Sequence, residues 1–160
     1  MTSDLERTAL VPDLWARSLG QRRSRPVLHI GERTLSAGEI EGHVSRYTQE
    51  LMAQGLGPGS PTATLGLNGP EVLFASGAEM QVGCRVTPLT ATASIDDQAY
   101  ILEDAEIDTL LFDPALQERA AALSDRVPGL KRLLSLGACE VGHDLRTGAA
   151  SRTAQHLHPP

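Results

Sequence analysis

The sequence predicts an α/β protein with a mostly parallel sheet and flanking helices, preceded by an N-terminal β-hairpin. Three observations support this fold class. Segments with helical apolar spacing alternate with short apolar segments typical of strands, from about residue 36 to residue 137. Helix-start motifs precede the predicted helices, and glycine or proline separates most elements. Strands that alternate with helices of this length form βαβ units, in which the strands run parallel.

The N-terminal part is predicted to contain a short helix at 12–19 and a hairpin at 27–35, followed by the most regular helix of the chain. Ser36 and Glu39 have the spacing of a capping box, in which each side chain bonds a backbone N–H that the helix start leaves free. Gly55 is expected to end this helix. Its apolar residues recur at steps of three and four, which predicts one buried stripe: Ile40, Val44, Tyr47 and Leu51.

The later elements are predicted from their boundaries. The expected strands are 62–67, 84–89, 108–112 and 131–136. Three caps are expected to start the intervening helices, namely Asn68, Ser94 together with Asp97, and Asp113 followed by Pro114. Periodicity ends at Gly137, so the sequence predicts one domain over 10–137 and an irregular or disordered tail over 138–160.

Composition and charge argue against several classes of protein. The net charge of −6 is unlike that of a nucleic-acid binder, and the basic run 21–25 lacks interleaved aromatic residues, which favours a solvated loop. Cys84 and Cys139 lie far apart and form no C-x-x-C pair, which favours a reducing compartment. The acidic N-terminus carries no secretion signal, and no apolar stretch is long enough to span a membrane. We therefore expect a cytoplasmic protein that binds no nucleic acid.

The segment 55–59 is the nearest approach to a phosphate-binding loop. A working loop follows a strand and opens a helix, because the helix N-terminus holds the phosphates. These glycines instead follow a predicted helix and open a strand. A Walker-type loop needs a Gly-Lys pair, but Lys131 is the only lysine of the chain and follows Leu130. A Gly-x-Ser-x-Gly nucleophile motif is also absent.

Histidine and cysteine residues form no recognisable catalytic or metal-binding set. We interpret His29 and His43 as surface or core side chains, and Cys84 as a small buried apolar side chain. His156 and His158 would give a metal only two ligands, in a segment without predicted structure. The sequence therefore predicts no catalytic, no cofactor-binding and no metal-binding residue.

Six short motifs follow one another along the chain. They read T-L-S-A-G-E-I at 34–40, G-L-G-P-G-S-P-T-A at 55–63, N-G-P-E-V at 68–72, G-C-R-V-T-P-L at 83–89, Q-A-Y-I-L-E-D-A at 98–105 and P-G-L-K-R at 128–132. In this order they resemble the AMP-forming acyl-CoA synthetases, also called adenylate-forming ligases. Ser60 and Thr90 depart from the family, which usually has Asp at the first position and Asn or Asp at the second. Within the family the actinobacterial fatty-acyl-CoA ligases are the most similar.

The resemblance implies that residues 10–137 form an incomplete N-terminal subdomain of the adenylate-forming ligase fold. The family reaction is ATP-dependent acyl adenylation followed by thioester formation with CoA, and ATP, Mg²⁺ and CoA are its cofactors. The family's Ser/Thr/Gly-rich ATP loop ending in Pro-Lys, its ribose-binding Asp and its catalytic Lys have no counterpart in this chain, so no site residue is carried over. Adenylation must neutralise two approaching anions. We therefore predict a truncated fatty-acyl-CoA ligase-like protein that uses no cofactor and is inactive alone.

Two alternative functions stay open. One is a stand-alone interaction or small-molecule-binding module derived from the same subdomain, and the other is an unrelated flavodoxin-like domain. For a fragment, the expected partner is a second chain that carries the missing catalytic half. Self-association through an uncovered apolar sheet face or edge is the other possibility, because such surfaces promote association.

Overall fold

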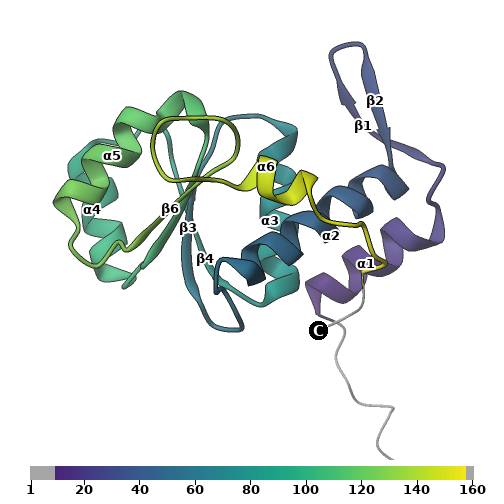
Figure 1. Cartoon of the computed structure of the whole chain (residues 1–160), viewed down its shortest axis with the longest axis horizontal. Coiled ribbons are helices and arrows are strands. Elements are labelled where there is room, and N and C mark those ends of the chain that lie inside the picture. The colour runs from purple at the N-terminus through teal and green to yellow at the C-terminus, as the bar shows by residue number, and fades with distance from the viewer. Residues whose placement is uncertain (1–9, 158–160) are drawn as a thin grey trace, which may run out of the picture.

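The computed structural model describes residues 10–157, which form a hairpin, a five-stranded parallel sheet and helices on both sheet faces (Figure 1). The fold class is therefore the one that the sequence predicts. In chain order the elements are α1 (Val11–Gln21), β1 (Pro26–Ile30), β2 (Arg33–Ser36), α2 (Ala37–Ala53), β3 (Pro61–Leu65), α3 (Pro70–Val82), β4 (Arg85–Leu89), α4 (Ile95–Asp104), β5 (Thr109–Phe112), the 3₁₀ turn η1 (Pro114–Leu116), α5 (Gln117–Arg126), β6 (Arg132–Ser135), β7 (His143–Asp144) and α6 (Leu145–Ala150).

The hairpin and α2 form as their sequence motifs predict. Strands β1 and β2 pair antiparallel, and Gly31 occupies the turn with φ of +56°. At the start of α2, the Ser36 Oγ accepts the Glu39 N–H at 3.3 Å, and the Glu39 carboxylate accepts the Ser36 N–H at 2.8 Å. The predicted apolar stripe of α2 is buried, since none of its four residues is more than 4% exposed. This stripe packs against α3.

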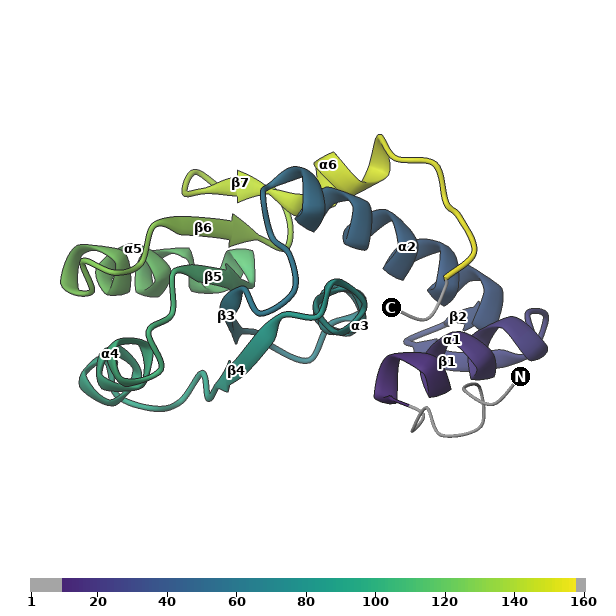
Figure 2. The same cartoon turned by 90° about the horizontal axis from the view of Figure 1, so that it is seen from below.

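The sheet has the strand order β4-β3-β5-β6-β7, and all its neighbours pair parallel (Figure 2). Each predicted strand is present, with ends shifted by at most two residues. Numbered along the chain within the sheet, the order is 2-1-3-4-5, which flavodoxin-like proteins share. Strand order alone therefore does not separate the two fold readings that the sequence left open.

Both faces of the sheet are covered by helices, which lie to either side of it in Figure 2. Successive side chains of a strand point to opposite faces. In β5, Leu111 joins the cluster formed with α2, α3 and α6, whereas Leu110 and Phe112 join the cluster formed with α4 and α5. We call these the α2–α3 side and the α4–α5 side of the sheet.

Two predicted helix starts need correction. Asn68 does not cap α3; Gly69 is the N-cap residue and Pro70 occupies the first turn, where its missing N–H costs nothing. Asp113 does act as a cap, since its carboxylate accepts the Ala115 N–H at 2.9 Å, but it starts the 3₁₀ turn rather than α5 itself.

The segment 138–160 was expected to be irregular, and the structure corrects this for its first half. Strand β7 pairs with β6, and helix α6 follows directly, with the Asp144 side chain accepting the Thr147 N–H at 3.1 Å. Leu145 and Ala149, one helical turn apart, are buried at 0% and 2% exposure. Two apolar residues among glycines and alanines give too weak a periodic signal to be read from sequence.

Candidate functional site

The glycine-rich turn at 55–59 lies where the sequence places it, between the end of α2 and the start of β3. Its backbone N–H groups are engaged within the protein: Gly59 donates to the Gly83 carbonyl at 2.8 Å, and Gly57 donates to the Ser60 Oγ at 2.9 Å. Ligands of open parallel sheets bind beyond the carboxyl ends of the strands. The turn lies at the amino end of β3, so it is at the wrong edge for a phosphate loop.

Lys131, the only lysine of the chain, also lies at the edge of the sheet that does not bind phosphate. Lys131 is exposed and immediately precedes β6, so it too lies at the amino edge of the sheet. Its N–H donates to the Asp108 carbonyl at 2.8 Å. At the opposite edge, the side chain that follows β5 is Asp113, a carboxylate already used as a helix cap. That negative charge would repel a phosphate rather than hold it.

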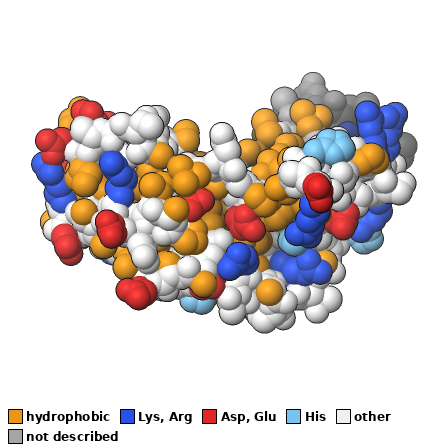
Figure 3. All heavy atoms as spheres, turned by 90° about the horizontal axis from the view of Figure 1, so that it is seen from above, with side chains coloured by type: hydrophobic (Ala, Val, Ile, Leu, Met, Phe, Trp, Pro, Cys, Tyr) orange, Lys and Arg blue, Asp and Glu red, His pale blue; other side chains and the backbone are white. Residues whose placement is uncertain are grey.

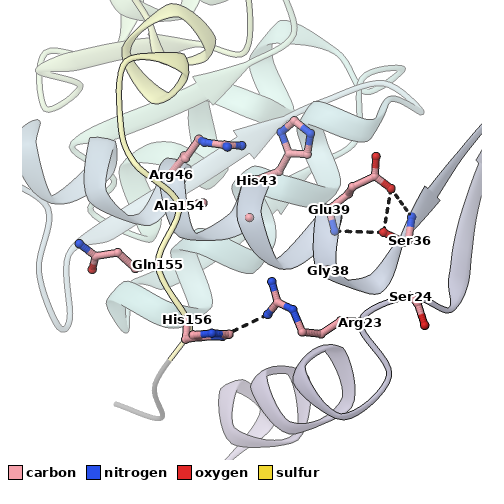
Figure 4. Close-up of a pocket in the computed structure, with 11 residues that line it drawn as sticks. Arg23, Ser24, Ser36, Gly38, Glu39, His43, Arg46, Ala154, Gln155 and His156 are labelled. Atoms are coloured by element: carbon pink, nitrogen blue, oxygen red, sulfur yellow. Dashed lines mark hydrogen bonds between the residues drawn. The ribbon is translucent and has the colours of Figure 1, made fainter.

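The largest of the hollows that we describe, about 630 Å³, lies between α2 and the C-terminal segment 151–157 (Figure 4). We call it the strap hollow; its lining includes Arg23, Glu39, His43, Arg46, Gln155 and His156. The C-terminal segment follows α2 through polar contacts, including Gln49 Nε2 to the Thr153 carbonyl at 2.8 Å and the Gln155 N–H to Ser45 Oγ at 2.9 Å.

Two buried glutamates of α2 anchor this arrangement. Glu41 pairs with Arg23, which also contacts His156 Nδ1 at 3.1 Å. Glu50 accepts from Arg152 at 2.8 Å and lies 2.8 Å from His143 Nε2. Burial tends to raise the pKa of Glu50, but these hydrogen bonds outweigh burial, so the net pKa is lowered and the group is held ionised. The network therefore fixes α6 and the C-terminal segment onto α2.

A second hollow of about 300 Å³ lies between α2, the start of α3 and α6, and we call it the arginine hollow. Its wall contains the His43 ring, which stacks on Phe74 with centroids 4.3 Å apart and planes 5° apart. Burial, the largest cause, lowers the pKa of His43, and neighbouring arginines act in the same direction. The other lining residues that matter chemically are Arg46, Tyr47, Glu71, Arg146 and Arg152.

A third hollow of about 350 Å³ is mostly apolar and lies beside β4, the strand at one end of the sheet order. We call it the edge groove; its lining includes Thr64, Val72, Met80, Val86, Pro88 and Leu89. Behind it, Thr64 donates to the fully buried Glu79 at 3.0 Å. Burial raises the pKa of Glu79. Burial is also the main cause that raises the pKa of the nearby Cys84 thiol to about 12. That thiol is therefore a poor nucleophile.

The histidines considered from sequence do not converge on one site. His29 bonds Thr34 within the hairpin at 2.9 Å, while His43 stacks on Phe74. His156 joins the Glu41 network, and His158 lies outside the described residues. Among residues 10–157, no three His, Cys, Asp or Glu side chains are placed to hold a metal ion.

One interpretation from sequence needs revision, and one cluster was missed. The basic run 21–25 is not only a solvated loop, because Arg23 from it pairs with the buried Glu41. The arginine hollow was not predicted at all. Its arginines at 46, 146 and 152 come from parts of the chain about a hundred residues apart, and no local spacing could have indicated that they meet.

Figure 3 shows one face of the molecule, on which hydrophobic side chains gather in the central part, with acidic and other polar side chains among them. No helix within the described part of the chain is both long enough and apolar enough to cross a lipid bilayer.

Comparison with known proteins identifies the family. Residues 15–159 match the family described as AMP-binding enzyme, which extends the match well beyond residue 137. The chain is 37% identical over 147 residues to the medium/long-chain-fatty-acid–CoA ligase FadD8 of Mycobacterium tuberculosis, covering 88% of this chain and 26% of that protein. It is 33% identical over 97 residues to a feruloyl-CoA synthase of an Amycolatopsis species, covering 59% of this chain and 19% of that protein.

Solved structures give the same fold. The anthranilate CoA ligase AuaEII, in complex with anthranoyl-AMP, superposes with a TM-score of 0.80 at 16% identity, over 99% of this chain and 31% of that one. The amide bond synthetase McbA from Marinactinospora thermotolerans gives 0.76 at 26% identity, over 91% and 29%. The chain thus spans between about a fifth and a third of the length of these proteins.

Proposed function

Because the chain belongs to the family of AMP-binding enzymes, we propose that residues 1–160 supply scaffold to a fatty-acyl-CoA ligase and activate no acid by themselves. The 37% identity to a medium/long-chain-fatty-acid–CoA ligase supports fatty acids as the substrate class. The family match over 15–159 supports descent from an adenylate-forming enzyme rather than from an unrelated flavodoxin-like domain.

The position of the single lysine is the observation that carries the proposal of inactivity. Adenylation brings a carboxylate to the α-phosphate of ATP while pyrophosphate leaves, so cations and aimed N–H groups must neutralise the developing charge. Lys131 and the glycine-rich turn at 55–59 lie at the amino edge of the sheet, and the N–H groups of Gly57 and Gly59 are already bonded. The groups for adenylation must then come from polypeptide outside these 160 residues.

We propose that the polypeptide that supplies these groups covers the edge groove. Strand β4 pairs only with β3 in the described part of the chain, so one edge of β4 is open. Val86 on this strand is 37% exposed, and Met80 and Leu89 line the apolar groove beside it. FadD8 contains roughly three quarters of its length outside the match, since the chain covers 26% of it. A second chain with that catalytic portion is the proposed partner.

Acyl-CoA formation tests this proposal. Residues 1–160 are incubated with MgATP, CoA and fatty acids of several lengths, alone and together with a polypeptide equivalent to the rest of a ligase such as FadD8. We expect no acyl-CoA from residues 1–160 alone, and product only in the mixture. Product from residues 1–160 alone, above a heat-inactivated control, would overturn the proposal.

A Val86→Asp variant of residues 1–160 places a charge in the edge groove. It should prevent the formation of acyl-CoA in the same mixture. The matched control is Tyr100→Asp, because Tyr100 is 66% exposed on α4, away from the groove, and should leave restoration intact. Equal restoration by both variants would show that the second chain does not use the edge groove.

One observation favours the stand-alone binding module instead. Helices already cover both faces of the sheet, so residues 1–160 have a core that needs no partner. A stand-alone module should be monomeric at all concentrations in analytical ultracentrifugation and should fail to restore product in the mixture above. Self-association with increasing concentration would instead support an uncovered interface.

We also propose a cytoplasmic location. Cys84 and Cys139 are both free, which suits a reducing compartment. Fractionation of cells that express the chain should recover it with cytoplasmic markers, and recovery with membranes or secreted protein would contradict this.

A further inference from the structure

We propose that the arginine hollow is a binding site for a small oxyanion, a carboxylate or a phosphate group. This inference does not depend on the proposed ligase function, because it rests only on side chains of α2, α3, α6 and the segment that follows α6. Its basis is a pair of arginines without ion-pair partners beside a buried hydroxyl without a hydrogen-bond partner.

The arginines come from two separate parts of the chain. Arg46 lies on α2 and Arg146 on α6, and both line the hollow. Within residues 10–157, neither guanidinium has an acidic group at ion-pair distance. In Figure 4 the Arg46 side chain extends toward the His43 ring, away from Arg23. Guanidinium groups suit carboxylate and phosphate, because their N–H groups match the geometry of these anions.

The charge balance of the hollow favours an anion. Three arginines and one glutamate line it, and the third arginine, Arg152, is neutralised by its ion pair with Glu50. Arg46 and Arg146 are thus opposed only by Glu71 among the lining residues. Asp144, the last residue of β7, accepts hydrogen bonds from Thr147 as the cap of α6, and its charge also acts on Arg146.

The buried hydroxyl is the second and independent observation. Tyr47 lines the hollow and is 3% exposed, yet its hydroxyl has no hydrogen-bond partner among the residues that the structure describes. Burial raises the pKa of Tyr47 far above its ordinary range, with Glu71 contributing, so the hydroxyl keeps its proton. Buried polar groups almost always have a partner. An oxyanion between the arginines would accept the hydrogen bond that this hydroxyl lacks.

The hollow is also bounded by specific side-chain contacts and is of suitable size. The stacked rings of His43 and Phe74 form one wall, and the Glu50–Arg152 pair holds α6 against α2. A volume of about 300 Å³ is at the lower end for ligand pockets, which suits a small anion or the anionic end of a larger molecule.

Titration of the purified chain with inorganic phosphate and, separately, with acetate tests the site, with sodium chloride at equal ionic strength as the reference. No ATP or magnesium is present, so the outcome is separable from that of the acyl-CoA assay. We expect saturable binding of at least one oxyanion with a Kd of about 1 mM or tighter, and a Tm that rises with its concentration. Tighter binding of phosphate points to a phosphate-bearing ligand, and tighter binding of acetate points to a carboxylate.

Three variants locate the binding. Tyr47→Phe removes only the unpartnered hydroxyl, so this variant should fold as well as the wild type. Its Kd for the anion should rise by about tenfold. Arg46→Gln and Arg146→Gln should each abolish saturation, whereas Arg126→Gln on α5 should bind as the wild type does. Absence of saturable binding, or equal binding by all variants, would overturn the site.

Discussion

The two sides of the sheet are built from different chemistry. On the α4–α5 side, the buried cluster consists of aliphatic residues and Phe112, which fill the space between the sheet and two helices. On the α2–α3 side, the helices carry all the buried carboxylates of the described residues: Asp13, Glu41, Glu50 and Glu79. The three hollows discussed above lie on or beside this second side.

This difference suggests different roles: the α4–α5 side serves as scaffold, and the α2–α3 side carries the candidate binding sites. An apolar cluster gains free energy from burial and needs no particular ligand. Buried carboxylates cost free energy unless each is paired, so they are found where arrangement matters. Glu41 and Glu50 are paired, and they position α6 and the C-terminal segment around the strap and arginine hollows. The α4–α5 side should therefore respond to mutation only in stability, and the α2–α3 side in ligand binding as well.

Leu123→Ala on the α4–α5 side should have the largest effect on stability. Leu123 lies on α5 and is fully buried against the sheet, so truncation leaves a cavity and should lower the unfolding free energy by about 2–5 kcal/mol. Urea denaturation measures this loss. If anion binding at the arginine hollow also fell in the folded variant, the two sides would not be separable.

Gly148→Ala tests the attachment of α6 on the other side. A Cβ at position 148 would lie 2.5 Å from the Glu50 carboxyl carbon, so either the Glu50 carboxylate leaves its ion pair with Arg152 or α6 shifts. We expect the unfolding free energy to fall by about 1–3 kcal/mol. Gly20→Ala on α1 is the matched control, since its Cβ would meet nothing within 4 Å and should stabilise by up to about 1 kcal/mol. Amide hydrogen exchange of α6 should quicken only in the first variant, and unchanged exchange would contradict the contact.

Glu79→Gln tests a fully buried carboxylate that has no cationic partner within residues 10–157. Burial raises its pKa above the ordinary value of 4.5, so the folded state binds the proton more tightly than the unfolded state. Its contribution to stability is therefore fully present below pH 4.5 and is lost as pH rises through the folded pKa. Glutamine cannot ionise.

Thermal denaturation from pH 4 to 8 should show this loss in the wild type relative to Glu79→Gln. The variant should be the more stable protein above pH 7, by about 1 kcal/mol. Subtracting the two profiles isolates Glu79 from Glu50, whose lowered pKa acts in the opposite direction. Parallel profiles would show that Glu79 does not titrate differently on folding.

Arg126→Gln should have the smallest effect. Arg126 pairs with Asp96 across α5 and α4, but the two side chains are 52% and 76% exposed, so water screens the pair. We expect a change in unfolding free energy of at most about 0.5 kcal/mol, seen as an unchanged midpoint in urea. A loss above 1 kcal/mol would mean that charges also matter on the α4–α5 side.

Local sequence signals predicted the fold well where they were self-contained. The Ser36–Glu39 capping box and the alternation of helix and strand needed only neighbouring residues. Helix α6 was missed because two buried residues among alanines and glycines carry little periodic signal. The Asn68 cap was wrong because the backbone enters the helix one residue later, at Gly69.

The arginine hollow could not be predicted from sequence. It depends on α6 docking against α2, which joins residues about a hundred positions apart through Glu50 and Arg152. The resemblance to adenylate-forming ligases could be predicted, because it depends on short motifs in order along the chain. The family match confirmed it.

ATP–pyrophosphate exchange is the most direct test of the central claim, because it reports the adenylation step without requiring CoA. Purified residues 1–160, with magnesium and a panel of fatty acids, should exchange labelled pyrophosphate into ATP no faster than the same sample after heat inactivation. Exchange that depends on both magnesium and a fatty acid would contradict the account, because it would place the charge-neutralising groups inside a chain whose only lysine lies at the amino edge of its sheet.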